Sequence, residues 1–171
     1  MKLIKEYIFC TKKLIDPLEE VQEIYAAVGS VPWSSGKAIA VSKTGKEIAW
    51  QEAYNRHFEL AFEKIGGWQP SPVLCEKPKH KGDFLRNGVF VEVQFGNSAT
   101  VYRDYYKFHY GFANRLLTLA VLVVPDDPTS FFPNRNPKSV GNMASFGYAS
   151  EHLSSLTIPV PVLLIGLLPE N

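Results

Sequence analysis

The sequence lacks a long apolar run, a cysteine pattern and a large net charge. These absences argue against a membrane protein, a disulfide-bonded protein and a protein that binds a polyanion through its overall charge. It has two cysteines, Cys10 and Cys75, which form no metal-binding or redox pattern. The longest apolar stretches, at 116–124 and 160–168, are too short to cross a bilayer. The formal net charge is only +1, so binding of a polyanion would depend on local groups. We therefore expect a cytoplasmic protein with no membrane association.

What is present is the composition of a folded domain. Apolar residues make up 46% and charged residues 20% of the chain, which is ordinary for globular proteins. A chain of 171 residues falls in the size range of one domain, and we find no internal repeat or low-complexity tract. We expect residues 1–171 to form a single domain.

Several helices are predicted by apolar residues at helical spacing. The first has Asp16 as its expected N-cap and Pro17 in its first turn. The predicted helices cover residues 17–28, 48–65 and 98–116, with a short polar helix at about 144–156.

Strands are predicted mainly by a hairpin signal and by buried apolar runs. Asn87-Gly88 separates two strand-like runs, which is the strongest short-range signal for a hairpin. Loops are expected at 30–46 and 125–140, and the proline- and lysine-rich segment 70–81 is predicted to be irregular. The predicted strands cover residues 82–86, 89–95, 118–124 and 160–167. Together these elements predict an α/β fold with a small mixed sheet sandwiched by helices.

The hairpin places two acids opposite each other. If Asn87 and Gly88 are the turn residues, Asp83 lies opposite Glu92, with Cβ atoms roughly 5 Å apart, where like charges destabilise a sheet. Something positive between them would make this arrangement tolerable. A hard cation such as Mg²⁺, which prefers oxygen ligands, would fill that need.

Strand alternation puts Gln94 on the same face as Glu92, while Val91, Val93 and Phe95 point to the core. We therefore expect a polar cluster of Asp83, Glu92 and Gln94. The alternative is that Glu92 and Gln94 are simply the wet face of a half-buried strand, since such spacings also arise by chance.

At DFLRNGVFVEVQFGN the chain resembles the BglII/BstYI family of type II restriction endonucleases, which belong to the PD-(D/E)xK nuclease superfamily. The family motif is an Asp, eight residues, and Glu-Val-Gln-Phe, where Gln replaces the usual Lys of the superfamily. Here the motif reads Asp83, then Glu92, Val93, Gln94 and Phe95. The resemblance extends to the loop at 42–46 and to the final apolar run.

The resemblance implies a PD-(D/E)xK restriction-endonuclease-like fold and Mg²⁺-dependent hydrolysis of double-stranded DNA. Asp83, Glu92 and the Val93 carbonyl would hold the metal, and water would attack a phosphodiester. Gln94 cannot act as a base and would only orient water or phosphate. It further implies a homodimer that cuts a short palindrome, with GATC within the site as the specific expectation.

Other functions remain open on the sequence. The chain could be another nuclease of the superfamily, such as a nickase or repair enzyme. It could also be a non-catalytic DNA-binding module with the same fold, or an α/β protein unrelated to nucleic acid.

Polar residues outside the motif are candidates for DNA contacts. Asn97 suits bidentate contact with adenine, although it also suits a turn before a helix. The aromatic residues of 98–116 are expected in the core or in a subunit interface. The candidate DNA-binding residues are Asn97, Ser98, Lys43, Lys81, Asn142 and Ser145.

Overall fold

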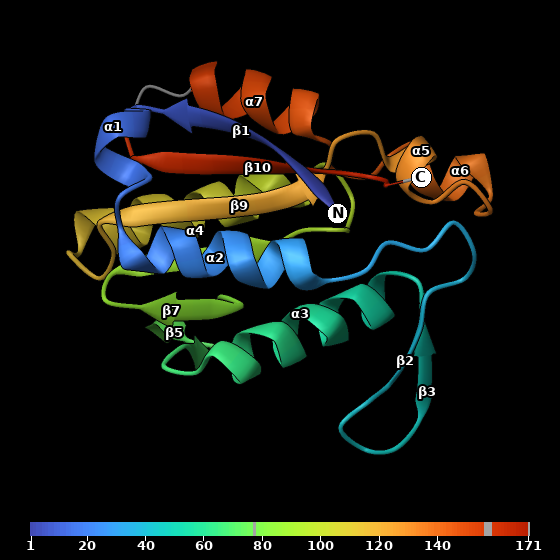
Figure 1. Ribbon diagram of the computed structural model, residues 1–171. Helices are drawn as coiled ribbons and strands as arrows, with labels where there is room; N and C mark the ends of the chain where they lie inside the picture. Colours follow the sequence, from blue (N-terminus) through green and yellow to red (C-terminus); the bar gives the residue numbers. More distant parts are fainter. Residues whose placement is uncertain (77, 156–158, 171) are drawn as a thin grey trace.

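A mixed sheet of six strands forms the centre of the protein. The computed structural model describes residues 1–76, 78–155 and 159–170. Strands β8, β9 and β10 are parallel, and each of the other sheet strands is antiparallel to its neighbour (Figure 1). In spatial order the strands are β1 (Lys2–Ile8), β10 (Val162–Leu168), β9 (Leu119–Pro125), β8 (Val89–Val93), β7 (Phe84–Arg86) and β4 (Gln69–Pro70).

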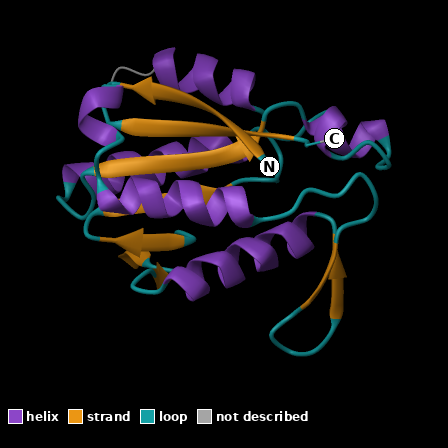
Figure 2. Cartoon of the chain, in the orientation of Figure 1, coloured by secondary structure: helices purple, strands orange, loops and turns teal. Residues whose placement is uncertain are grey.

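Helices cover both faces of this sheet (Figure 2). Helices α2 (Glu19–Ser30) and α3 (Gln51–Ile65) pack on one face, and α4 (Thr100–Ala113) and α7 (Phe146–Ser155) pack on the other. The remaining elements are α1 (Lys12–Ile15), α5 (Pro128–Phe131), α6 (Pro137–Val140) and two hairpins, β2–β3 (Ile39–Val41, Glu47–Ala49) and β5–β6 (Val73–Glu76, Lys79–Lys81).

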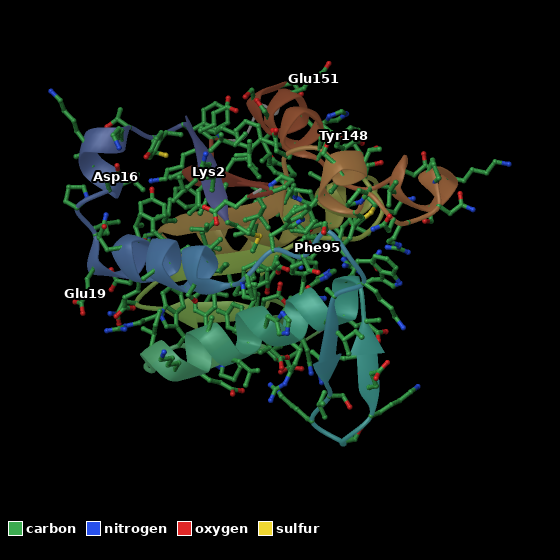
Figure 3. All side chains as sticks on the ribbon, turned by 45° about the vertical axis from the view of Figure 1, so that its right-hand side comes forward. Lys2, Asp16, Glu19, Phe95, Tyr148 and Glu151 are labelled. Atoms are coloured by element: carbon green, nitrogen blue, oxygen red, sulfur yellow. The ribbon has the colours of Figure 1, made fainter. Side chains whose placement is uncertain are left out.

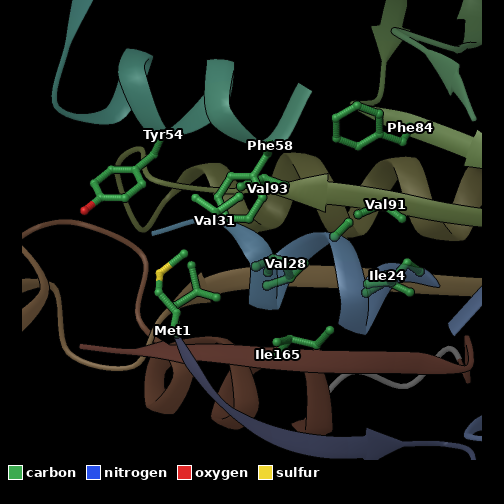
Figure 4. Packing of buried hydrophobic residues seen from close by; sticks show 14 of the residues in the cluster. Met1, Ile24, Val28, Val31, Tyr54, Phe58, Phe84, Val91, Val93 and Ile165 are labelled. Carbon is green, nitrogen blue, oxygen red and sulfur yellow. The ribbon is translucent and has the colours of Figure 1, made fainter. Parts of the chain in front are cut away.

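The core lies in two layers because the central strands are buried on both sides. Val91 and Val93 of β8 point toward Ile24 and Phe58 on α2 and α3 (Figure 4). Phe90, which precedes Val91 in the strand, faces the opposite layer with residues of α4 and α7. All residues of β9 are buried, which explains why its sequence is a continuous apolar run rather than an alternating one.

The predicted sandwich is confirmed, and the main predicted helices and strands occur with bounds shifted by a few residues. The last helix ends at Ser155, and residue 156, where the prediction ended, lies outside the described residues. No helix in the described part of the chain is both long and apolar enough to cross a membrane.

The predicted start of the first long helix is wrong. Helix α2 begins at Glu19 with Leu18 as its N-cap, and Asp16 instead ends the short helix α1. The carboxylate of Asp16 accepts hydrogen bonds from Tyr7 and Tyr25, at 2.6 and 2.8 Å, and is therefore not available to cap backbone N–H groups.

Two segments predicted without strands contain hairpins. Segment 30–46 contributes β2, whose turn toward β3 uses Gly45 at φ +84°. Strand β4 reaches into 70–81 only with Pro70, which needs no donor at the sheet edge, and β5–β6 form a small separate hairpin within this segment. The prolines therefore limit the length of these strands rather than prevent them. Segment 125–140 contains α5 and α6, capped by the side chains of Asp127 and Asn136.

Strand β1 was not predicted from the sequence. It pairs antiparallel with β10, from Lys2 opposite Leu168 to Ile8 opposite Val162. As an edge strand it is only partly buried and carries lysines, so its apolar alternation is weak.

Candidate active site

The predicted register of the central hairpin is confirmed. Asn87 and Gly88 both have positive φ, 47° and 80°, as a type I′ turn requires. Beyond the ladder, the N–H of Asp83 donates to the Val91 carbonyl at 3.2 Å. The Val93 N–H donates to Asp83 Oδ2 at 2.7 Å, which holds this carboxylate beside β8. The paired residues are Phe84–Val91, Leu85–Phe90 and Arg86–Val89.

Asp83 and Glu92 line the same hollow, which has a volume of about 450 Å³. Its remaining walls carry mostly basic side chains from β6 and α4, namely Lys79, His80, Lys81, Arg103 and Lys107. Two acids therefore line a hollow whose other side chains are mostly basic. Such an arrangement is suited to a phosphate and a cation together.

Gly82 lets the chain pass close to the second acid. A Cβ atom at Gly82 would lie 2.2 Å from the Phe90 ring and 3.2 Å from Glu92 Oε1. A larger residue would displace Phe90 from the core. The absence of a side chain at Gly82 therefore allows the segment that carries Asp83 to lie close to strand β8.

Glu92 is buried, with 6% of its surface exposed, so the alternative that it forms the wet face of a half-buried strand is wrong. Its Oε1 accepts a hydrogen bond of 2.5 Å from Lys107, which is only 3% exposed. The protein thus supplies a positive charge of its own beside the paired acids. The need for positive charge at this position does not by itself require a metal ion.

Gln94 is also buried, but both of its polar atoms are used inside the protein. Its Nε2 donates to Asp104 Oδ2 at 2.7 Å, and its Oε1 accepts from the Gly96 N–H at 2.7 Å. Gln94 lines a different hollow from the one that Asp83 and Glu92 share. It is therefore connected to Glu92 through α4 rather than through a common surface.

The surroundings of Asp83 and Glu92 disfavour the charged form of both carboxylates. Burial raises the pKa of Asp83, although the hydrogen bond from Val93 and the charge of Lys107 oppose this effect. Burial and then the charge of Asp83 raise the pKa of Glu92 well above 4.5, despite Lys107. A bound cation would reverse both effects, because it favours the charged carboxylates.

The donor set fits a hard divalent cation that keeps several waters. Among the described residues, no group of three or more His, Cys, Asp and Glu side chains could hold a metal. Two carboxylates and the Val93 carbonyl are nevertheless the kind of oxygen ligands that Mg²⁺ takes, with the rest of its shell from water and phosphate. The shared hollow leaves room for those ligands.

Three of the candidate DNA-binding residues meet just beyond Gln94. Asn97 forms an isolated bridge with Met143, and the Ser98 N–H donates to the Asn142 carbonyl at 2.7 Å. The Asn97 side chain accepts from the Ala99 N–H at 2.8 Å, so its role in a turn is confirmed.

The other three candidates lie in separate places. Ser145 Oγ accepts from the Tyr148 N–H at 3.3 Å, close to the start of α7. Lys81 is exposed and borders the hollow of Asp83 and Glu92. Lys43 lies in the β2–β3 turn and forms an ion pair of 3.3 Å with Glu59, so the structure does not bring it to that hollow.

The polar residues of α4, Arg103, Asp104 and Lys107, were not predicted from the sequence to be functional. They lie among the aromatic residues of that helix, which dominate its sequence pattern. A signal was available, since Val101, Asp104, Phe108 and Gly111 follow helical spacing and are all buried. A charged residue within such an apolar stripe indicates a buried polar contact.

The fold and the cleft define a class of protein. The structure is similar to the crystal structure of restriction endonuclease BglII complexed with a DNA 16-mer, with a TM-score of 0.77 and 18% sequence identity. The match covers 99% of this chain and 78% of that one. The fold is therefore that of a restriction endonuclease.

The family follows from the sequence comparison. The model of the restriction endonuclease BglII/BglIII family matches residues 10–167, and the chain belongs to this family. It is accordingly a site-specific deoxyribonuclease, which confirms the resemblance at the hairpin motif. A comparison with curated proteins finds no significant match.

Proposed function

We propose that this protein is a type II restriction endonuclease that uses Mg²⁺ to hydrolyse phosphodiester bonds of double-stranded DNA within a short palindrome. Asp83, Glu92 and the Val93 carbonyl would hold the metal, and Gln94 would complete the catalytic set. The observation that carries this proposal is that the buried Glu92 and the partly buried Asp83 share one basic-walled hollow on a fold of this family.

The residues around the hollow have separate tasks in this proposal. When bound, Mg²⁺ would neutralise charge that develops on the phosphate and lower the pKa of the attacking water. Lys79, Lys81 and Arg103 border the acids and would bind the phosphate oxygens. Gln94 has one N–H and one lone pair beyond its internal hydrogen bonds and would use them for orientation alone.

Sequence recognition is proposed for the segments that meet beyond Gln94. Asn97, Ser98 and Asn142 lie together at the end of β8, and Ser145 follows them in the chain. Contacts from this group to base edges would lie next to the cleavage site. A palindrome containing GATC is the specific form of this proposal, and it rests on the family resemblance.

A homodimer is proposed because a palindrome has two-fold symmetry. Helix α4 buries Phe108 but leaves Tyr102, Tyr106 and Phe112 exposed, with Leu116 just beyond it. A second copy that covered these residues would remove apolar surface from water. Sedimentation of the protein with and without DNA tests this part independently of cleavage.

Digestion of a supercoiled plasmid tests the proposed activity. With Mg²⁺ we expect discrete linear fragments whose mapped ends share one palindrome, and with EDTA we expect none. Glu92→Ala should abolish cutting, whereas Glu19→Ala, on the exposed side of α2, should not (Figure 3). A smear would indicate a nonspecific nuclease, nicked circles a nickase, and uncut plasmid a non-catalytic DNA-binding module.

A further inference from the structure

A buried ion bridge joins the two polar residues of β8 through helix α4. Lys107 Nζ lies 2.5 Å from Glu92 Oε1 and 2.7 Å from Asp104 Oδ1, and Asp104 Oδ2 accepts from Gln94 Nε2 at 2.7 Å. Asp104, Lys107, Glu92 and Gln94 are all buried. The chain of contacts therefore runs from Glu92 to Gln94 without passing through solvent.

The geometry of a helix beside a strand explains the match. Glu92 and Gln94 are two residues apart on one side of β8, a separation of roughly 7 Å at about 3.3 Å per residue. Asp104 and Lys107 are three residues apart and lie on one side of α4. One turn of the helix thus presents a partner to each of the two strand residues.

The contacts of Lys107 limit what this residue can do. An ammonium has three N–H donors. Three oxygens surround Nζ, because the Lys81 carbonyl lies 3.3 Å away in addition to Glu92 and Asp104. Nζ donates hydrogen bonds to Glu92 and to the Lys81 carbonyl, and its contact with Asp104 Oδ1 is an ion pair, so oxygens of the protein surround this buried ammonium. Lys107 is therefore suited to positioning other groups rather than to contacting the substrate.

The orientation of the Gln94 amide depends on this bridge. The Gly96 N–H fixes Oε1, and the Asp104 carboxylate accepts from Nε2, so a flipped amide would lose both contacts. A Cβ at Gly96 would lie 2.6 Å from Gln94 Oε1, so this contact also needs a glycine. Lys107 Nζ places a positive charge 2.7 Å from the other oxygen of the same carboxylate, Asp104 Oδ1.

We propose that Lys107 and Asp104 are positioning residues for cleavage, because together they hold Glu92 and Gln94 in fixed orientations within one connected network. This inference rests on the proposed function for its effect on cleavage. The network itself can be tested without any activity.

Variants of matched volume test the effect on cleavage. We expect Lys107→Met to lower kcat about 100-fold on a duplex carrying the mapped site, with KM and binding in Ca²⁺ changed less than about threefold. Lys107→Arg should recover part of kcat, because it keeps the charge. Lys64→Met, an exposed lysine on α3, is the matched control and should cleave normally. Equal kcat for Lys107→Met and wild type would overturn the proposal.

Asp104→Asn breaks the other half of the bridge with little change in volume. An amide carries no negative charge and offers only one acceptor atom, so it cannot both accept from Gln94 and form an ion pair with Lys107. We expect kcat to fall in the same direction as for Lys107→Met. A variant that retains wild-type kcat would show that the bridge does not matter for cleavage.

The side-chain amide signals of Gln94 in an NMR spectrum give a readout that does not depend on cleavage. These signals are assigned by their loss in Gln94→Leu. We expect slow hydrogen exchange in the wild type and exchange at least about tenfold faster in Lys107→Met. If the Gln94 amide exchanged at the same rate in Lys107→Met as in the wild type, the proposed link between Lys107 and Gln94 would be wrong. If the wild type cut no DNA, the proposed function would fail while this measurement still decided the bridge.

Discussion

Asp16 and Glu92 are both carboxylates that accept a hydrogen bond from a lysine, yet their surroundings shift the carboxyl pKa in opposite directions. Burial acts to raise the pKa of Asp16, but hydrogen bonds from Lys12, Tyr7 and Tyr25 outweigh it and lower the pKa to about 2. Among the described residues, Lys107 alone donates to the side chain of Glu92, while burial and the charge of Asp83 raise the pKa of Glu92 well above 4.5.

The difference lies in how completely each acid is satisfied. Asp16 is partly exposed and has several donors, so its charged form is favoured in the folded protein. Glu92 is buried near the carboxylates of Asp83 and Asp104, and the charge of Lys107 only partly offsets burial and these two negative charges. Acids held in an environment that disfavours their charge are typical of functional sites, where a ligand supplies the missing positive charge. Figure 3 labels Asp16 near α1, well apart from Phe95, which follows Gln94.

The largest expected effect is on cleavage by variants of the paired acids. We expect Asp83→Ala and Glu92→Ala each to lower the cleavage rate at least about 10³-fold, because each removes a proposed metal ligand. Asp16→Ala should leave the rate within about twofold of the wild type, since the described partners of its side chain do not line the hollow. Rates are measured with excess enzyme on a duplex that carries the mapped site.

Measurements of DNA binding show whether Asp83→Ala and Glu92→Ala lose the cleavage step itself or the ability to bind DNA. Both variants should still bind that duplex in EDTA, because the basic side chains around the hollow remain. If Glu92→Ala cut DNA at the wild-type rate, the assignment of metal ligands to this hairpin would be wrong.

Gln94→Ala should have a smaller effect. We expect the cleavage rate to fall about 10- to 100-fold while the dissociation constant for DNA changes less, because the amide orients groups and does not transfer a proton. Gln22→Ala, which removes an exposed glutamine of α2, serves as the control. A loss of binding equal to the loss of rate would indicate a role in recognition instead.

The pH dependence of stability should reveal the strain at Glu92 in the metal-free protein. Its folded pKa is raised above its unfolded value, so the folded state binds the proton more tightly. Stability from this group is therefore present below about pH 4.5 and declines as pH rises through the raised pKa. Glu92→Gln should flatten that decline in denaturant unfolding carried out with EDTA. An identical slope in the variant would contradict the raised pKa.

The hairpin could be predicted from the sequence because its information is local. Asn87-Gly88 fixes the turn, and the turn fixes which residues of the two strands face each other. The positions of Asp83, Glu92 and Gln94 on the hairpin follow from that register alone. The family motif falls on the same residues, so the two lines of inference coincide.

The buried bridge could not be derived in the same way because it depends on packing between distant elements. Which helix faces β8, and which turn of it meets Glu92, follows only from the folded arrangement of α4 on the sheet. Strand β1 was missed for a related reason, since its pairing with β10 joins opposite ends of the chain. Partners far apart in sequence leave little trace in local spacing.

The smallest expected effect concerns stability at Asp16. We expect Asp16→Asn to lower the free energy of unfolding at pH 7 by about 1 kcal/mol, since it weakens hydrogen bonds of a partly exposed carboxylate. Because the folded pKa of Asp16 is lowered to about 2, its contribution is present above the ordinary value of 3.8 and is lost as pH falls through 2. The variant should therefore lose less stability than the wild type between pH 4 and 2 in urea unfolding, with cleavage unchanged. If the wild type and Asp16→Asn lost the same amount of stability between pH 4 and 2, the pKa of Asp16 would not be lowered, and the contrast with Glu92 would be smaller.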